Sequence, residues 1–278
     1  MFQLGVILDS FRLPLEQALA AAEKLGVQGI QVYATKEACS PQSMTSAQRA
    51  EYLKRVEAHG LQISALCGDF GKGFGDSTQN PALIEASKRI MDLAMDLHTN
   101  IVTTHIGVVP ADSAHPRYRI MQDACGELAA YADRVGAHFA IETGPETAQT
   151  LVGFLDGLHS KGVAVNFDPA NLVMVTGDDP VQAVYTLKDY IVHTHAKDGR
   201  RLMVKNPEAI YGIVQDDLIT DEAFIELPLG QGDVDFAGWL HALKEIGYQG
   251  YLTIEREVGN NPVQDIALAV DYLKNAGI

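Results

Sequence analysis

Eight apolar, strand-like runs alternate with eight helix-like segments along the whole chain. The runs are rich in β-branched residues and are bounded by glycine or polar turns, which is typical of β-strands. They predict strands at about 3–8, 28–33, 62–67, 101–105, 138–142, 163–168, 191–196 and 250–255. Apolar residues at helical spacing predict helices between them, at about 15–25, 45–59, 80–97, 117–136, 147–158, 180–189, 235–247 and 262–276. Such an alternation indicates parallel strands joined by right-handed crossovers.

The length of the chain favours closing these elements into one barrel. The chain has 278 residues and no linker, and a (β/α)8 barrel typically has about 250 residues. An open doubly wound sheet should carry a glycine-rich dinucleotide motif after its first strand, and this sequence has none there. We therefore predict an α/β fold with a single (β/α)8 barrel domain over residues 1–278. The long connection at about 197–232 would lie on the face where barrel enzymes carry their active sites.

Four strand-like runs in the second half of the chain end on residue types that bind metals. These runs are His138–Glu142, Val163–Asp168, Ile191–His195 and Tyr251–Glu255. Charged groups are almost never fully buried unless they are paired or bound to a metal. One such ending alone is also typical of a helix cap or a turn. Four of them at the same end of buried parallel strands predict one shared site.

A divalent metal would balance the charge of this predicted site. Glu142, Asp168 and Glu255 together with His195 carry a formal charge of about −3 when the carboxyl groups are ionised. Without a cation these groups would repel each other in a cavity of low dielectric constant. Oxygen-rich ligation favours Mn²⁺ or Mg²⁺, with Co²⁺ and Zn²⁺ as alternatives. A structural zinc site would instead use four Cys or His ligands.

Further polar residues lie near the same ends of the predicted strands. His193 shares a face with His195, because side chains alternate along a strand; it is more typical of a supporting histidine than of a ligand. His105 ends the fourth strand and either lines the site or packs beside it. Lys197 and Arg201 belong to a basic cluster after the seventh strand, which is either a solvated loop or a contact to an anionic or polyhydroxylated substrate. We take His105, His193, Lys197 and Arg201 as candidates for substrate binding.

The composition excludes several classes of partner. The 21 basic and 36 acidic residues give a net charge of −15, which disfavours binding to nucleic acid. We expect no membrane insertion, because no apolar stretch approaches the roughly 20 residues of a spanning helix. The N-terminal segment lacks the features of a signal peptide. Cys39, Cys67 and Cys125 are widely spaced, which predicts reduced thiols and a cytoplasmic location.

Five short segments carry a family resemblance. They are Ala140–Thr143, Asn166–Leu172, His193–Asp198, Gly230–Phe236 and Ile254–Arg256. Together and in this order they resemble the xylose isomerase-like TIM-barrel superfamily, in particular its sugar phosphate isomerase/epimerase branch. The resemblance covers essentially the whole chain and implies a TIM barrel. It is less specific for any one activity within the superfamily.

The resemblance also implies roles for individual residues. It implies that Glu142, Asp168, His195 and Glu255 bind one divalent metal. Glu142 and Glu255 would be the acid/base pair of an isomerase or epimerase that acts on a small sugar, keto-sugar or sugar phosphate. The metal would polarise a carbonyl and an adjacent hydroxyl and stabilise a cis-enediolate. Asn171 stands where a histidine is common; it can hydrogen-bond a substrate hydroxyl but cannot shuttle a proton.

Other members of the superfamily supply the alternatives. Arg201 would take the position of a substrate-binding arginine, and the barrels often associate into homo-oligomers through their helical faces. A dehydratase acting on a cyclic polyol ketone, of the inosose or dehydroshikimate type, would use the same metal site. A non-catalytic sugar-binding barrel is disfavoured by the intact set of four ligands. The zinc endonuclease that repairs abasic DNA is disfavoured by the acidic charge and by Asn171 and Asp235, where that enzyme has histidines.

Overall fold

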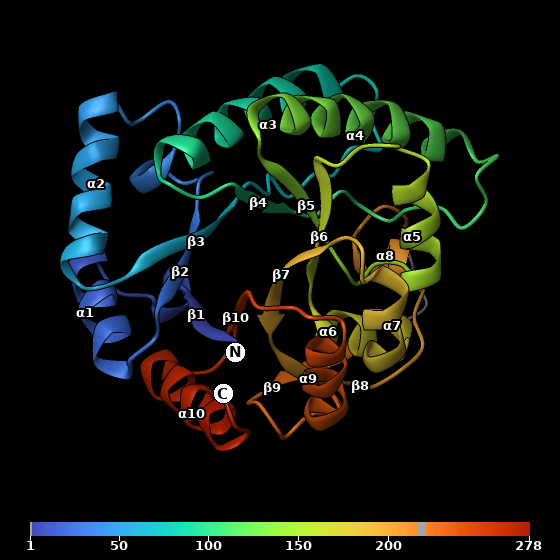
Figure 1. The fold of residues 1–278 in the computed structure, drawn as a ribbon. Coiled ribbons are helices and arrows are strands. Elements are labelled where there is room, and N and C mark those ends of the chain that lie inside the picture. Colours follow the sequence, from blue (N-terminus) through green and yellow to red (C-terminus); the bar gives the residue numbers. More distant parts are fainter. Residues whose placement is uncertain (1, 216–220) are drawn as a thin grey trace.

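Eight parallel strands close into a single barrel in the computed structural model, which describes residues 2–215 and 221–278 (Figure 1). The order around the barrel is β1-β10-β7-β6-β5-β4-β3-β2. The barrel strands are β1 (Gln3–Ile7), β2 (Gly29–Tyr33), β3 (Gln62–Cys67), β4 (Ile101–Thr104), β5 (His138–Glu142), β6 (Val163–Phe167), β7 (Ile191–Ala196) and β10 (Tyr251–Ile254). The predicted (β/α)8 barrel is confirmed.

A layer of helices surrounds the barrel (Figure 1). The helices that follow the barrel strands are α1 (Leu15–Leu25), α2 (Ser46–Ala58), α3 (Asn80–Asp96), α4 (Pro116–Val135), α5 (Ala148–Asp156), α7 (Pro180–Leu187), α9 (Phe236–Glu245) and α10 (Pro262–Asn275). Their ends follow local chemistry. Thr45 and Gln48 form a capping box at the start of α2, and Asp235 caps α9 by accepting from the Gly238 amide. The apolar core fills the space between strands and helices, with Phe11, Phe139 and Trp239 fully buried.

The connection after β7 contains structure that the sequence did not reveal. It forms an antiparallel hairpin of β8 (Asp198–Arg201) and β9 (Phe224–Leu227), and the short helix α8 (Pro207–Ile210) lies between the two strands in the chain. The Asp198 carboxylate accepts from the amides of Gly230 and Gly232, each at 2.9 Å, and so ties the end of the connection to its start. The prediction of a loop over about 197–232 was therefore incomplete; residues 216–220 lie outside the described residues.

A second unpredicted segment follows β6 directly. The short helix α6 (Pro169–Asn171) continues into a π-helical turn, η3 (Leu172–Thr176). Asp168 caps α6 by accepting from the Asn171 amide at 3.0 Å. Asp168 thus lies just outside the strand that was predicted to contain it. None of the helices in the described residues is both long and apolar enough to cross a membrane. Cys39, Cys67 and Cys125 are buried and form no disulfide.

Candidate metal centre and active site

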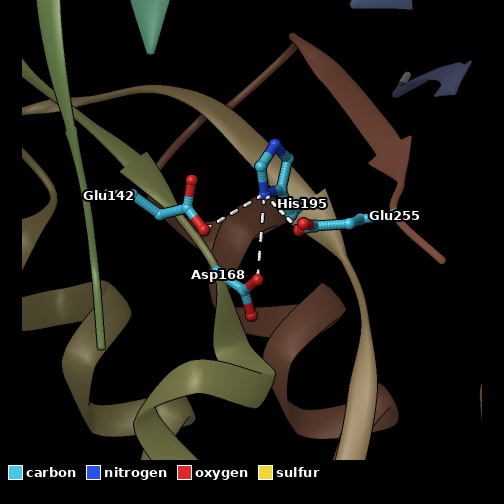
Figure 2. Close-up of side chains that lie close together, drawn as sticks. All are labelled: Glu142, Asp168, His195 and Glu255. Atoms are coloured by element: carbon cyan, nitrogen blue, oxygen red, sulfur yellow. Dashed lines mark ion pairs between the residues drawn. The ribbon is translucent and has the colours of Figure 1, made fainter. Parts of the chain in front are cut away.

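Four side chains converge at the carboxyl ends of β5, β6, β7 and β10. Glu142, Asp168, His195 and Glu255 are all buried, and one ligand atom from each lies within 4.8 Å of the others. Figure 2 shows the two glutamates reaching the His195 ring from opposite sides. His195 Nδ1 lies 2.8 Å from Glu255 Oε2, 3.5 Å from Glu142 Oε1 and 3.7 Å from Asp168 Oδ2. The sequence placed these four residues together, and the fold brings them together.

The cluster has the chemistry of a divalent-metal site. Asp168 Oδ2 and Glu255 Oε2 are buried, and among the described residues they face His195 Nδ1 without a well-directed hydrogen bond. Buried carboxylate oxygens normally have hydrogen-bond partners, because leaving them unsatisfied is costly. A cation between the four side chains would satisfy both oxygens. Three carboxylates and one imidazole suit one divalent ion with remaining open positions. The donor set therefore fits the group that the sequence predicts.

The pKa values within the cluster reflect this crowding. Burial raises the pKa of Asp168 to about 6. Burial also opposes the charge on His195, but the carboxylates of Glu255 and Glu142 outweigh it and raise the pKa of the imidazolium well above its usual range. Against the effect of burial, Lys197 and His195 hold the pKa of Glu255 well below normal. In the metal-free protein, the proton on His195 thus balances part of the negative charge that a cation would otherwise balance.

A loop contact positions Asp168. Thr143 Oγ1 donates to the Asp168 carbonyl at 2.9 Å and accepts from the Asp168 amide at 2.8 Å. The adjoining Gly144 has φ +142°, and a Cβ added there would overlap the Asn171 side chain. The close approach lets Asn171 Nδ2 donate to Glu142 Oε1 at 3.0 Å. Thr143 and Gly144 therefore hold the loop after β5 against the start of α6.

A hydrogen-bonded chain inside the barrel supports Glu142. Asn166 Nδ2 donates to Glu142 Oε2 at 3.0 Å, and Asn166 Oδ1 lies 2.8 Å from His193 Nδ1. The other ring nitrogen of His193 lies 2.9 Å from the Thr253 hydroxyl. Burial lowers the pKa of His193 well below normal, so the ring is neutral and can donate at Nδ1 while accepting at Nε2. Both Glu142 oxygens thus have an amide donor, from Asn166 and from Asn171.

Gln31 orients the imidazole of His195 and was missed in the sequence. Its Oε1 lies 2.9 Å from His195 Nε2, and its Nε2 donates to Thr103 Oγ1 at 3.1 Å. Gln31 Oε1 accepts a hydrogen bond from the Nε2–H of His195, so Nδ1 is the nitrogen of this ring that faces the carboxylates. Gln31 is a fully buried polar residue within the apolar run Gly29–Tyr33. A polar residue within a buried apolar run is also the pattern that identified the other site residues in the sequence.

A cavity of about 710 Å³ adjoins the cluster. Three of the five predicted substrate-binding residues line it, and two do not. His105, Asn171 and Lys197 line this cavity together with Glu142 and Glu255. His105 lies between Asp69 Oδ2, 3.1 Å from Nδ1, and Glu142 Oε1, 3.4 Å from Nε2. Although burial opposes its charge, Glu142 and Asp69 raise the pKa of His105 to about 9.

The described residues that line the cavity do not include His193 or Arg201. His193 is fully buried and both of its ring nitrogens are hydrogen-bonded inside the barrel, so it supports the site from there. Arg201 Nη1 donates to the Thr176 carbonyl at 3.0 Å, which directs its guanidinium to the π-helical turn. These two residues therefore lie off the cavity lining, and their contact with substrate stays a prediction. Position along the chain did not show the direction in which Arg201 points.

Of the basic cluster predicted after the seventh strand, Lys197 does reach the cavity. It is buried, and its Nζ lies 2.8 Å from Glu257 Oε2, 3.4 Å from Glu255 Oε1 and 3.9 Å from Glu226 Oε2. Glu226 comes from β9, so the hairpin that follows β7 contributes directly to the cavity wall. Lys197 therefore connects Glu255 of the candidate metal centre with Glu226 and Glu257, which line the cavity. Glu226 and Glu257 carried no signal in the sequence that pointed to this role.

A family model and a solved structure match this chain over nearly its whole length. The model, described as xylose isomerase-like TIM barrel, matches residues 19–276. A xylose isomerase domain protein from Planctomyces limnophilus superposes with a TM-score of 0.81 at 26% sequence identity, covering 99% of this chain and 96% of that one. The fold and the order of the elements are thus shared over the entire barrel.

Curated relatives carry two kinds of enzyme name. An L-ribulose-5-phosphate 3-epimerase from Salmonella heidelberg is 22% identical over 269 residues, which cover 92% of this chain and 87% of that protein. An inosose dehydratase from Clostridium tetani is 26% identical over 148 residues, or 51% of this chain and 47% of that protein. The chain thus spans about half the length of the dehydratase that it matches.

Proposed function

The chain belongs to the xylose isomerase-like TIM-barrel family, and from that premise we propose that it is a metal-dependent isomerase or epimerase of a small sugar, keto-sugar or sugar phosphate. The observation that carries the proposal is the placement of Glu142 and Glu255. Both carboxylates line the cavity, and they flank His195 from opposite sides (Figure 2). Two such carboxylates can take a proton from one face of a bound carbon and deliver one to the other face.

The metal would be held by Glu142, Asp168, His195 and Glu255, and when bound it would polarise the substrate carbonyl and the neighbouring hydroxyl. The protein supplies the rest. Asn166 and Asn171 each donate to one Glu142 oxygen, which fixes the plane of that carboxylate. Lys197 lies 3.4 Å from Glu255 and favours its ionised form. Both glutamates thus start as bases of defined orientation.

His105 supports the ionised form of Glu142. Its Nε2 lies 3.4 Å from Glu142 Oε1, and Asp69 holds its other ring nitrogen. Because its pKa is raised to about 9, the ring is an imidazolium at neutral pH and stabilises the Glu142 carboxylate as a base. Several of the residues that line the cavity are apolar or aromatic, which reduces the number of polar groups that could hold water near the reacting carbon. A relative named as an epimerase, aligned over 92% of this chain, supports the assignment.

A dehydratase is the second candidate, because relatives named as inosose dehydratases match the chain. Removal of a proton beside a carbonyl is common to both reactions. They differ in whether the β-hydroxyl then leaves as water. An absorbing enone-type product from a cyclic polyol ketone would identify the dehydratase, whereas an isomeric sugar without such absorbance would identify the isomerase or epimerase.

Deuterium exchange tests the proposal. The metal-loaded protein is incubated in D2O with ketoses, inososes and their phosphates, and NMR follows deuterium entering the carbon next to the carbonyl. We expect exchange in the wild type, its loss in Glu142→Gln and Glu255→Gln, and retention in Glu51→Gln, which alters an exposed carboxylate on α2. Full exchange in both cavity variants would overturn the proposed acid/base roles. A metal-free protein that binds sugar equally well with EDTA would instead be a sugar-binding barrel.

A further inference from the structure

Carboxylates outnumber cations along the cavity. Five glutamates line it, against the three cations His105, Lys197 and Arg256; these glutamates are Glu142, Glu222, Glu226, Glu255 and Glu257. Two of the glutamates, Glu142 and Glu255, belong to the metal centre, and the other three equal the cations in number. The cavity therefore presents hydrogen-bond acceptors and no excess of positive charge to whatever enters it.

All three cavity cations are already paired with carboxylates, His105 with Asp69 at 3.1 Å and Glu142 at 3.4 Å. Lys197 Nζ lies 2.8 Å from Glu257, besides its contact with Glu255. Arg256 lies 2.6 Å from Glu226 and 3.1 Å from Asp265. Binding sites for phosphate groups normally offer Arg or Lys donors that the phosphate itself can engage. A phosphate in this cavity would have to displace a carboxylate from each cation and would then lie beside that carboxylate.

Neighbouring donors are also engaged. Arg12 donates to the carbonyls of Glu257 and Gly259 at 2.6 and 2.8 Å. The Glu257 amide donates to Glu226 Oε1 at 3.1 Å. Helix α10 begins three residues after Gly259, but its first turn already holds the acidic Asp265. Residues 216–220, which the structure does not describe, contain no Lys or Arg in the sequence.

Six further residues that line the cavity are apolar or aromatic. They come from the π-helical turn, α8, the segment after α8, and β9, and they are Met174, Val175, Ile210, Tyr211, Phe224 and Ile225. Carboxylates bind hydroxyl donors, and an apolar and aromatic wall packs against C–H faces. A molecule that carries hydroxyls and C–H faces without a charge satisfies both kinds of lining residue at once.

We infer that the substrate of this site is an uncharged polyhydroxylated ketone, and that phosphorylated sugars are excluded by the pairing of Lys197 and Arg256 with cavity carboxylates. The inference rests on the proposed function, because it concerns the molecule on which Glu142 and Glu255 act. It narrows that proposal, which includes phosphorylated sugars among its test compounds. The relevant property is electrostatic complementarity, since the size of the cavity admits either class.

Matched pairs of compounds test the inference. Deuterium exchange is measured for D-fructose against D-fructose 6-phosphate, and for D-ribulose against D-ribulose 5-phosphate, with scyllo-inosose added to the neutral group. We expect kcat/KM for exchange to be at least about tenfold higher for neutral compounds. Equal or higher values for the phosphates would overturn the inference while leaving the proposed function standing. Absence of exchange in both groups would overturn the proposed function, and the inference with it.

Two variants test the electrostatic cause. Glu257→Gln removes the carboxylate at 2.8 Å from Lys197, and Glu222→Gln removes a cavity carboxylate that forms no ion pair with Lys197 or Arg256 among the described residues. Both side chains belong to exposed residues, so the fold should tolerate either change. We expect Glu257→Gln to shift the preference toward phosphates by about tenfold, and Glu222→Gln to shift it by much less.

Calorimetry with inorganic phosphate gives a second readout that does not need turnover. With the metal-loaded proteins, Glu257→Gln should bind phosphate more tightly than Glu222→Gln does, because only the first change removes a carboxylate that is paired with the Lys197 ammonium. The bound metal is common to both proteins, so its own affinity for phosphate cancels in the comparison. Equal affinity in the two variants would show that the Lys197 pairing does not exclude anions, and would overturn the inference.

Discussion

Gln31 and His195 stand on different strands of the barrel wall and meet through a contact of 2.9 Å between Gln31 Oε1 and His195 Nε2. The contact fixes which imidazole nitrogen faces the carboxylates of the metal centre. Gln31 is in turn held by Thr103, to which its amide nitrogen donates. The position of a metal ligand on β7 thus depends on two polar side chains from β2 and β4.

Replacing Gln31 should weaken metal binding without removing a ligand. Gln31→Leu keeps a similar volume but leaves His195 Nε2 without its acceptor, so the ring can rotate or change tautomer. We expect a loss of about 10- to 100-fold in metal affinity, measured by competition with a chromophoric chelator. Thr103→Val, which removes only the partner of Gln31, should cost less. Wild-type affinity in Gln31→Leu would contradict the orienting role.

Metal binding should release protons. The pKa of Asp168 is raised to about 6 and that of His195 lies well above its usual range, so the metal-free site holds protons that a cation must displace. Affinity should therefore fall as the pH is lowered through about 6. Calorimetry at pH 7 in buffers of different ionisation enthalpy should show about one proton released per ion. Asp168→Asn should lose most of the affinity, and a heat of binding that does not depend on the buffer would contradict the expectation.

Glu146 should make the fold less stable as the pH rises. It accepts from the Val109 amide through Oε2, its Oε1 has no partner among the described residues, and burial raises its pKa to about 8. The folded protein therefore keeps a proton that the unfolded chain loses near its ordinary pKa, so stability declines between about pH 4.5 and pH 8.

Glu146→Gln, a neutral side chain of the same shape, should flatten that decline and raise Tm at pH 8 by a few degrees. Tm at pH 4 should change little, because Glu146 is protonated there in both the folded and the unfolded chain. Glu57→Gln on the exposed face of α2 provides the control. A Tm at pH 8 that is unchanged in Glu146→Gln but raised in Glu57→Gln would assign the pH dependence to surface charge instead.

The chain from Thr253 through His193 and Asn166 to Glu142 should contribute to stability as well as to geometry. Asn166→Asp replaces the donor to Glu142 with a second carboxylate, and we expect the free energy of unfolding to fall by about 2–3 kcal/mol. Thr253→Val removes the donor at the other end of the chain and should cost about 1 kcal/mol. Urea unfolding measures both, and a larger loss for Thr253→Val would show that Glu142 does not depend on Asn166.

The barrel could be predicted because each of its strands is a continuous apolar run, and burial on both faces dictates that pattern. The hairpin of β8 and β9 could not be predicted in this way. Asp198–Arg201 is polar, and its partner strand begins more than twenty residues later in the chain. Asp198 is buried because distant backbone amides, those of Gly230 and Gly232, satisfy its carboxylate. These hydrogen bonds compensate for the burial of the Asp198 charge, and they cannot be predicted from the sequence around Asp198.

The ligand set was predictable because four polar residues interrupt four buried runs at equivalent positions. Gln31 interrupts another buried run, and treating that interruption in the same way would have placed it beside His195. The role of Arg201 was not predictable, since sequence order places it near the cavity while its hydrogen bond to Thr176 points it elsewhere. Glu226 and Glu257 required the tertiary structure, because only the return of β9 brings Glu226 to Lys197.

The division of the site between barrel strands and the β8–β9 hairpin has an evolutionary consequence. The proposed proton-transfer and metal-binding groups come from the ends of β5, β6, β7 and β10, whereas Tyr211, Phe224, Ile225 and Glu226 all belong to one contiguous stretch between β8 and the end of β9. Mutation, insertion or exchange of that single stretch would alter the cavity lining and leave the four clustered side chains in place. The architecture thus allows new specificities to arise by local changes in one segment of the chain.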